Sequence, residues 1–256
     1  MSIPTRAPRT ALITGAARRI GAAIARDLAA NGFAVAIHHL ASRDEASDLA
    51  SAIRAAGGRA ETFRADLTDP GETEGLVSRV RTVLGPVDLL VNNASIFRDD
   101  SALHHEAEIW NLHFAMHARA PAQLAAAIAA QEEIDAGLIV NMIDQRVWRP
   151  NPDFFSYALS KSTLWAETRT LAQALAPRIR VNAIGPGPAI RSERQAEADF
   201  ARQIDGLMLK RGPSLDEFGA TVRYFYDTPS ITGQMIALDG GQHLAWETPD
   251  IAGIPE

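Results

Sequence analysis

The sequence predicts an α/β fold, a doubly wound parallel sheet with helices on both faces. Short apolar runs rich in β-branched residues alternate with longer alanine-rich stretches along the chain. This alternation is typical of right-handed βαβ units, whose strands are buried on both faces of a parallel sheet. Because no Pro/Ser-rich linker, low-complexity tract or repeat interrupts it, we expect residues 1–256 to form a single domain.

Each expected element follows from its own residue pattern. The expected strands are short buried runs at residues 10–14, 33–37, 87–92, 138–142, 179–184 and 234–238, with a weaker run at 59–63. The expected helices lie between them, at residues 21–31, 44–57, 72–84, 106–130, 156–176 and 215–226.

Residues 185–212 depart from this pattern. They open with Gly-Pro-Gly-Pro and are charged and irregular, which suits a mobile lid over a substrate site. Arg191 and Arg194 in this segment are candidates for contact with a substrate carboxylate, although a solvated loop surface is the simpler interpretation.

Composition excludes several functional classes. Hydrophobic residues make up 46% of the 256 residues and charged residues 22%, as in ordinary globular proteins. A net charge of −6 gives no general attraction to nucleic acid or to acidic membranes. The chain has no cysteine, and no stretch approaches the ~20 apolar residues that a membrane span needs. We therefore expect a cytoplasmic protein.

A glycine-containing turn follows the first expected strand. Its sequence is Thr14-Gly15-Ala16-Ala17-Arg18-Arg19-Ile20-Gly21, and a helix comes next. Such a turn places backbone N–H groups and a helix N-terminus against a pyrophosphate, although an ordinary βα turn has the same outline. Arg18 and Arg19 lie where the helix dipole disfavours cations, so a bound anion explains them, with surface solubility as the alternative.

The second expected strand ends without the acidic residue that NAD-specific sites place near this point. No carboxylate precedes Asp44, and the donors His38, His39, Ser42 and Arg43 occupy the region instead. This favours a 2′-phosphate and therefore NADPH, although the two histidines are also compatible with a plain strand-end surface.

Polar and small residues end the next two strands. Asp66-Leu67 follows the third strand, where a carboxylate accepts from an adenine amino group, and Asn92-Asn93-Ala94-Ser95 ends the fourth. Ligands of open α/β sheets bind at these carboxyl ends, so we expect Asp66, Leu67, Asn93, Ala94 and Ser95 to contact the cofactor.

Tyr157 and Lys161 form the strongest catalytic candidate. Four residues apart on a helix, they share one face. A phenol has a reference pKa near ~10, which a neighbouring ammonium and a cationic nicotinamide ring lower. Tyr157 is then able to act as a general acid when a substrate is reduced.

The ordered motifs resemble those of the short-chain dehydrogenase/reductase family. They are Thr14-Gly15…Gly21, Asn92-Asn93-Ala94, Tyr157…Lys161, Pro186-Gly187 and Ile231-Thr232-Gly233…Asp239-Gly240-Gly241. The resemblance implies a Rossmann-type sheet of about seven strands, a nicotinamide cofactor held in part by Pro186 and Gly187, and a homotetramer. It also implies that Lys161 binds the nicotinamide ribose.

Several departures from that family resemble its pteridine reductase branch, which includes bacterial dihydromonapterin and dihydrofolate reductases. Most family members have Gly at the position of Arg19, Ser at that of Asp144 and Asn at that of His117. The family motif Asn-Asn-Ala-Gly ends here in Ser95 instead of Gly. In that branch Phe97 stacks on the pterin, while Ser95 and Arg19 hydrogen-bond the pterin and the cofactor phosphates. Asp144 relays a proton to the ring nitrogen if burial raises its pKa. A solvated loop carboxylate and plain loop packing are the alternatives for Asp144 and Phe97.

We therefore predict an NADPH-dependent reductase that converts a dihydropterin to the tetrahydro form. A general ketone or 3-oxoacyl reductase is the second hypothesis, and Asp144 in place of Ser argues against it. A non-catalytic NADP(H)-binding regulator is the third, and the intact pair Tyr157 and Lys161 argues against that. His113 and His117 have the spacing of a zinc helix, but residue 114 is Phe and no third ligand is evident, so we expect no metal.

Overall fold

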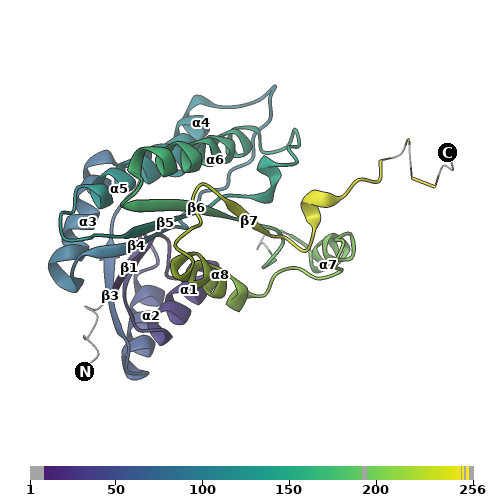
Figure 1. Cartoon of the computed structure of the whole chain (residues 1–256). Coiled ribbons are helices and arrows are strands. Elements are labelled where there is room, and N and C mark those ends of the chain that lie inside the picture. The colour runs from purple at the N-terminus through teal and green to yellow at the C-terminus, as the bar shows by residue number, and fades with distance from the viewer. Residues whose placement is uncertain (1–8, 192–194, 249, 251, 254–256) are drawn as a thin grey trace.

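The computed structural model describes residues 9–191, 195–248, 250 and 252–253, and a seven-stranded parallel sheet lies at its centre (Figure 1). The strand order is β3-β2-β1-β4-β5-β6-β7, so the chain reverses direction of winding between β1 and β4. The strands are β1 (Arg9–Ile13), β2 (Phe33–His39), β3 (Arg59–Arg64), β4 (Val87–Asn92), β5 (Gly137–Met142), β6 (Ile179–Pro186) and β7 (Met235–Leu238). The predicted doubly wound fold is confirmed, including the weaker third strand.

Helices cover both faces of the sheet (Figure 1). One face carries α1 (Arg19–Ala30), α2 (Arg43–Ala55) and α8 (Leu215–Asp227), and the other carries α3 (Pro70–Leu84), α4 (Ala107–Phe114), α5 (Ala120–Ala129) and α6 (Phe155–Leu175). Successive strand side chains point to opposite faces. Ile13 and Leu12 of β1, both fully buried, accordingly belong to the two separate apolar cores.

Helix starts on both faces follow from local hydrogen bonding. The side chain of Asp69 accepts from the amides of Gly71 and Glu72 and so caps α3, whose first residue is Pro70. Ser214 and Glu217 form a reciprocal capping box at the start of α8. By contrast, no side chain caps the N-terminus of α1, which leaves its first amides for another partner.

The single helix predicted at residues 106–130 is interrupted. A π-helical segment, Ala115–Arg119, separates α4 from α5. The wider turn keeps His113 and His117 on the same side, with ring centroids 5.8 Å apart and ring planes 17° apart. Such insertions are frequent at functional sites, and here it aims both rings at α6.

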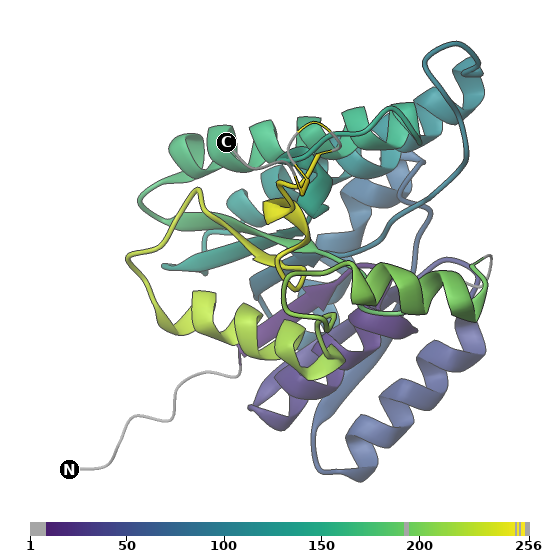
Figure 2. The same cartoon turned by 90° about the vertical axis from the view of Figure 1, so that its right-hand side faces the viewer.

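The segment predicted as an irregular lid contains a helix, α7 (Glu197–Asp205). It lies at the edge where the strands have their carboxyl ends, together with the short turn Gln242–Leu244 that follows β7 (Figure 2). Residues 192–194, including the candidate Arg194, lie outside the described part of the chain. Within the part that is described, no helix is both long and apolar enough to cross a bilayer.

Candidate active site

A recess of about 490 Å³ opens at the carboxyl ends of β1 and β4, where the winding reverses. We call it the switch-point recess. Most residues predicted to bind the cofactor line it, namely Gly15, Arg18, Arg19, Ile20, Gly21, His38, Ser42, Leu67, Asn93, Ala94 and Ser95. His39, named in the sequence as a donor for a 2′-phosphate, lines it too, whereas sequence reasoning did not select the lining residues Ala17, Leu40, Ala41, Ala65, Ile96 and Met116.

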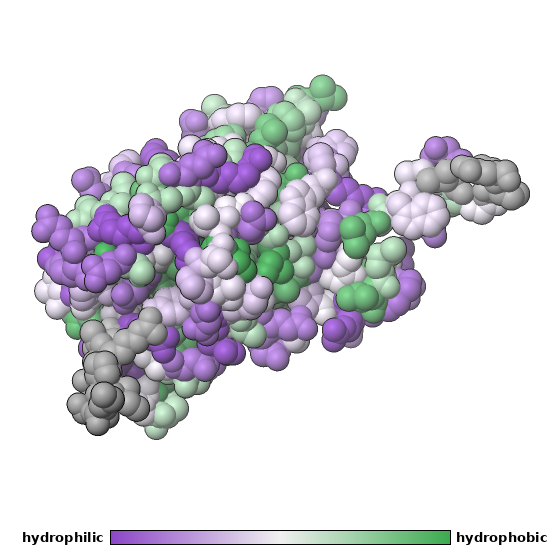
Figure 3. Space-filling model, in the orientation of Figure 1, coloured by the Kyte–Doolittle hydropathy of each residue, from purple (hydrophilic) through white to green (hydrophobic). Residues whose placement is uncertain are grey.

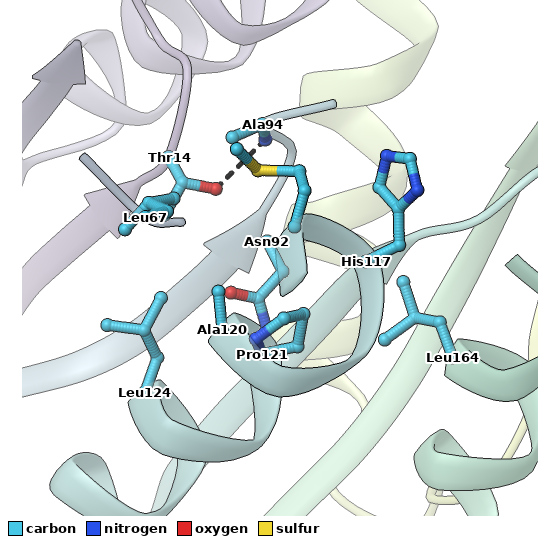
Figure 4. A pocket seen from close by; sticks show the side chains of 10 residues that line it. Thr14, Leu67, Asn92, Ala94, His117, Ala120, Pro121, Leu124 and Leu164 are labelled. Atoms are coloured by element: carbon cyan, nitrogen blue, oxygen red, sulfur yellow. Dashed lines mark hydrogen bonds between the residues drawn. The ribbon is translucent and has the colours of Figure 1, made fainter. Parts of the chain in front are cut away.

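The floor of this recess is a backbone cradle with no room for side chains. Gly15 has φ +61°, and a Cβ there would lie 2.9 Å from Ala94 Cα. A Cβ at Gly21 would lie 2.6 Å from Asn93 Nδ2. Thr14 Oγ1 accepts from the amides of Asn93 and Ala94 at 2.9 Å each, and Figure 4 shows the second of these bonds. The turn and the end of β4 are therefore held together closely enough for backbone contact with a phosphate.

Arg19 connects the cradle to the segment that follows β6. Its φ is +55°, a left-handed conformation that an arginine adopts only at an energetic cost. Its guanidinium donates to the carbonyls of Ile190 and Arg191, at 3.3 Å each. Arg18 instead lies 3.7 Å from Glu45 on α2. The two arginines predicted as an anion site thus diverge, and only Arg19 reaches the opposite wall.

His38 lines the recess but is not available as a charged donor. Its Nδ1 accepts from the amide of Gly15 at 3.0 Å, which requires the proton on Nε2, and Nε2–H donates to the carbonyl of Ala65 at 3.0 Å. Burial lowers the pKa of His38 to about 4. The neutral ring therefore fixes the glycine turn. The neighbouring His39 has a buried Nδ1 without a partner among the described residues, and it lines the recess too.

The other predicted cofactor residues lie around this recess without lining it. Oδ1 of Asp66 accepts from the amide and hydroxyl of Thr68, so that oxygen is already engaged. Arg43 is exposed at the start of α2. Pro186 and Gly187 line a neighbouring recess, and a Cβ at Gly187 would come within 2.6 Å of Asp239 Cα.

Asp144, Tyr157 and Lys161 meet between β5 and α6. The hydroxyl of Tyr157 donates to Oδ2 of Asp144 at 3.3 Å, and Lys161 Nζ donates to the carbonyl of Met142 at 2.8 Å. Burial raises the pKa of the Asp144 carboxyl. Burial and the charge of Asp144 raise the pKa of Tyr157 well above its usual value. Burial also lowers the pKa of Lys161 to about 8. The carboxyl and the phenol thus favour their protonated forms.

His117 supports this centre from the π-helical segment. Its Nε2 accepts from the amide of Ile96 at 3.2 Å, which places the ring proton on Nδ1, and Nδ1–H donates to Ser160 Oγ at 2.8 Å. The same Nε2 lies 2.9 Å from Ser95 Oγ, which therefore donates to it. A hydrogen bond between the Ser95 and Tyr157 hydroxyls lowers the pKa of Tyr157, although burial and the charge of Asp144 raise it by more.

His113, one helical turn before His117, makes the same kind of contacts. Its Nε2 accepts from the amide of Arg98, and Nδ1–H donates to Ser156 Oγ at 2.7 Å. Both histidines therefore connect the loop that carries Phe97 to α6. With their ring nitrogens engaged in this way, neither offers a lone pair to a metal ion. No group of three possible ligand residues occurs elsewhere in the described ranges.

A second recess of about 180 Å³ lies beside the catalytic carboxyl, and we call it the Phe97 recess. The Phe97 ring is 40% exposed and lies 4.8 Å from the Tyr157 ring and 4.4 Å from the Phe154 ring, between centroids. Sequence reasoning missed Phe154, whose φ of +55° carries no sequence signal. The lining residues are Phe97, Asp144, Gln145, Arg146, Pro186, Gly187, Pro188, Ile190, Gln195, Phe200, Gln203 and Gln242.

Residues 9–200 match the family model described as short chain dehydrogenase. The chain belongs to the short chain dehydrogenase family. FolM alternative dihydrofolate reductase 1 from Brucella canis, crystallised with NADP, is 57% identical, covers 96% of this chain and 98% of its own, and superposes with a TM-score of 0.93. The same reductase from Brucella suis, also with NADP, is 57% identical over 96% of this chain and 99% of its own, with a TM-score of 0.92.

A third relative has a lower identity. The 3-oxoacyl-acyl-carrier-protein reductase FabG of Staphylococcus epidermidis is 28% identical over 92% of this chain and 99% of its own. The identity to the two Brucella reductases is about twice as high.

Replacing Arg19 by glycine separates two effects of this residue, the cost of its backbone conformation to stability and the contribution of its guanidinium to cofactor binding. Glycine adopts positive φ freely, whereas a non-glycine residue there costs roughly 1–2 kcal/mol. We expect Arg19→Gly to leave the thermal unfolding midpoint unchanged or raised and to weaken NADPH binding about tenfold, because the guanidinium contact is lost. Thermal unfolding and fluorescence titration with NADPH measure the two effects.

Arg19→Asn is the matched control, since asparagine tolerates positive φ but carries no charge. It should weaken NADPH binding as much as Arg19→Gly does. Unchanged affinity in both variants would show that Arg19 is not part of the cofactor site.

Proposed function

We propose that this short chain dehydrogenase is an NADPH-dependent reductase that converts a dihydropterin to its tetrahydro form. The observation that carries the proposal is a partly buried carboxyl with a raised pKa, Asp144, hydrogen-bonded to the Tyr157 hydroxyl beside the partly exposed Phe97. Reduction of a ring C=N bond needs a proton on nitrogen, and a carboxyl with a raised pKa is a suitable donor. The similarity to two dihydrofolate reductases supports the same chemistry.

The switch-point recess fits a dinucleotide. Gly15 and Gly21 both line it, and neither leaves room for a Cβ between the glycine turn and the end of β4, so the backbone itself forms this wall. The free N-terminal amides of α1 and the guanidinium of Arg19 would hold the pyrophosphate. The unpartnered Nδ1 of His39, with Ser42 beside it, would meet the 2′-phosphate. NADPH supplies the hydride when bound.

The protein's own groups would then bind the substrate and deliver the proton. The Phe97 ring offers a flat apolar face to a heteroaromatic ring. Asp144 would deliver its proton to the substrate, and the Tyr157 hydroxyl, which donates to Oδ2 of Asp144, would restore it. Lys161 lies in the same buried centre, and by family resemblance it holds the nicotinamide ribose.

A ketone reductase is the less favoured reading of this site. In that chemistry a hydroxyl donates to the substrate carbonyl and remains neutral, whereas Asp144 presents a group that titrates. A regulator that only binds NADP(H) has no need of the Asp144–Tyr157 hydrogen bond. The geometry therefore supports a dihydropterin reductase over both alternatives.

A substrate panel tests the proposal. NADPH absorbance is followed with dihydromonapterin, dihydrobiopterin, dihydrofolate and an acetoacetyl thioester. We expect turnover of at least one dihydropterin, a loss of about a hundredfold or more in kcat for Tyr157→Phe, and a smaller loss for Asp144→Ser. Turnover of the thioester alone would instead assign the protein to the general ketone reductases, and cofactor binding without any turnover would favour the regulator.

The pH profile tests the role of Asp144. Its raised pKa keeps the carboxyl protonated to higher pH than usual, so kcat/KM should be constant at low pH and fall as the pH rises through that pKa. The charge of Arg146 lowers this pKa, so Arg146→Gln should move the fall to higher pH. Asp144→Asn should abolish that fall. A fall that persists unchanged in Asp144→Asn would assign the titration to another group.

We also propose a homotetramer, as the family resemblance implies, and a cytoplasmic location, as expected from the composition. Apolar surface gathers where the C-terminal segment leaves the body (Figure 3), and Met208, Leu209, Leu244 and Trp246 are each at least half exposed. Exposed apolar patches of this kind are typical of interfaces. Light scattering coupled to gel filtration should give four times the mass of the chain, and a single-chain mass would contradict the proposal.

A further inference from the structure

A third recess, of about 350 Å³, adjoins the Phe97 recess, and we call it the Arg149 recess. The two share Gln145, Arg146 and Gln242 in their walls, so they form neighbouring parts of one surface. The lining residues of the Arg149 recess are Gln145, Arg146, Arg149, Pro150, Asn151, Pro152 and Gln242. The two recesses therefore adjoin at Gln145, Arg146 and Gln242, close to a ligand seated beside Asp144.

The Arg149 recess is positively charged in a protein whose net charge is −6. It contains two arginines, and no acidic residue is among its described lining residues. Within the described chain, neither Arg146 nor Arg149 has an ion-pair partner. Arg149 donates one Nη1–H to the carbonyl of Gln242 at 3.3 Å, and the Arg146 guanidinium lies 5.7 Å from the Phe154 ring centroid. Both guanidinium groups retain donors for an anion.

Gln145 gives an independent indication of a polar ligand. The residue is 4% exposed, it lines both recesses, and its Oε1 has no hydrogen-bond partner among the described residues. A buried amide oxygen without a partner is costly, unless a ligand donor satisfies it.

The size of the Phe97 recess limits what fits there. Its volume of about 180 Å³ is smaller than the range of roughly 300–1,000 Å³ that larger small-molecule ligands occupy. A two-ring pterin head suits this space, but a pterin with an aminobenzoyl-glutamate extension needs the adjoining volume. The extension then ends in carboxylates, which arginine binds with good geometry.

We propose that the Arg149 recess binds the glutamate carboxylate of dihydrofolate, and that Arg149, assisted by Arg146, determines selectivity between dihydrofolate and dihydropterins without an acidic tail. The inference rests on the proposed function, because it assumes a dihydropterin head beside Asp144. Under this proposal Arg149 takes the role of carboxylate ligand that the sequence suggested for Arg191 and Arg194. Arg191 donates to Gln195 within its own segment and lines neither recess, and Arg194 lies outside the described residues.

Steady-state kinetics on two substrates test this selectivity. KM and kcat are measured for dihydrofolate and for dihydromonapterin, at saturating NADPH, with wild type, Arg149→Gln and Arg149→Lys. We expect Arg149→Gln to raise the KM for dihydrofolate about tenfold relative to that for dihydromonapterin, with kcat little changed, since one charged hydrogen bond is lost. Arg149→Lys should recover part of the affinity. The wild-type KM for dihydrofolate should also rise more steeply with NaCl than that of Arg149→Gln.

Arg59→Gln is the control for loss of one positive charge. Arg59 is exposed at the amino end of β3, the edge strand farthest from β7. The substitution Arg59→Gln should therefore leave both KM values unchanged. If wild type reduces neither substrate, the proposed function fails. If it reduces dihydromonapterin but not dihydrofolate, or if Arg149→Gln changes both KM values equally or neither, the proposed function stands and the carboxylate site is overturned.

Discussion

The hydroxyl of Thr14 is the contact on which the arrangement of the whole site depends. It donates to the carbonyl of Val91 and accepts from the amides of Asn93 and Ala94, so every hydrogen-bonding position of the group is used. These bonds join the end of β1 to the end of β4 at the point where the winding reverses. They set the distance between the glycine turn and the loop that leads to Ser95 and Phe97, and therefore the relation of the cofactor cradle to the substrate platform.

Burial rather than attraction between charges determines the chemistry at the centre. For Asp144, Tyr157, Lys161 and His117, burial is the largest cause of the shifted pKa. The acids are shifted toward protonation and the bases toward neutrality. Asp144 and Tyr157 therefore keep their protons until negative charge develops on a nearby group. Hydride transfer to a ring C=N bond creates such a charge on the ring nitrogen, which then takes the proton.

Arg19 and His117, two departures from the family pattern expected from the sequence, have different structural consequences. Arg19 takes a backbone conformation suited to glycine and gains a bridge to the segment after β6. His117 occupies a π-helical turn, where its ring reaches both Ser95 and Ser160. The first connects the cofactor cradle to the wall of the Phe97 recess, and the second connects the substrate loop to the catalytic helix.

The sequence by itself determined the order of strands and helices, the glycine turn and the pair Tyr157–Lys161, because these depend on spacing along the chain. Apolar periodicity and a separation of four residues are local properties, and the structure keeps them. Tertiary structure decided the role of His38, the interruption of helix 106–130 and the positive φ of Phe154. It alone placed Arg149 beside Gln242, which lies 93 residues further along the chain. Burial and hydrogen-bond partners come from segments distant in sequence, so only the packed fold determines whether a histidine binds phosphate or supports a turn.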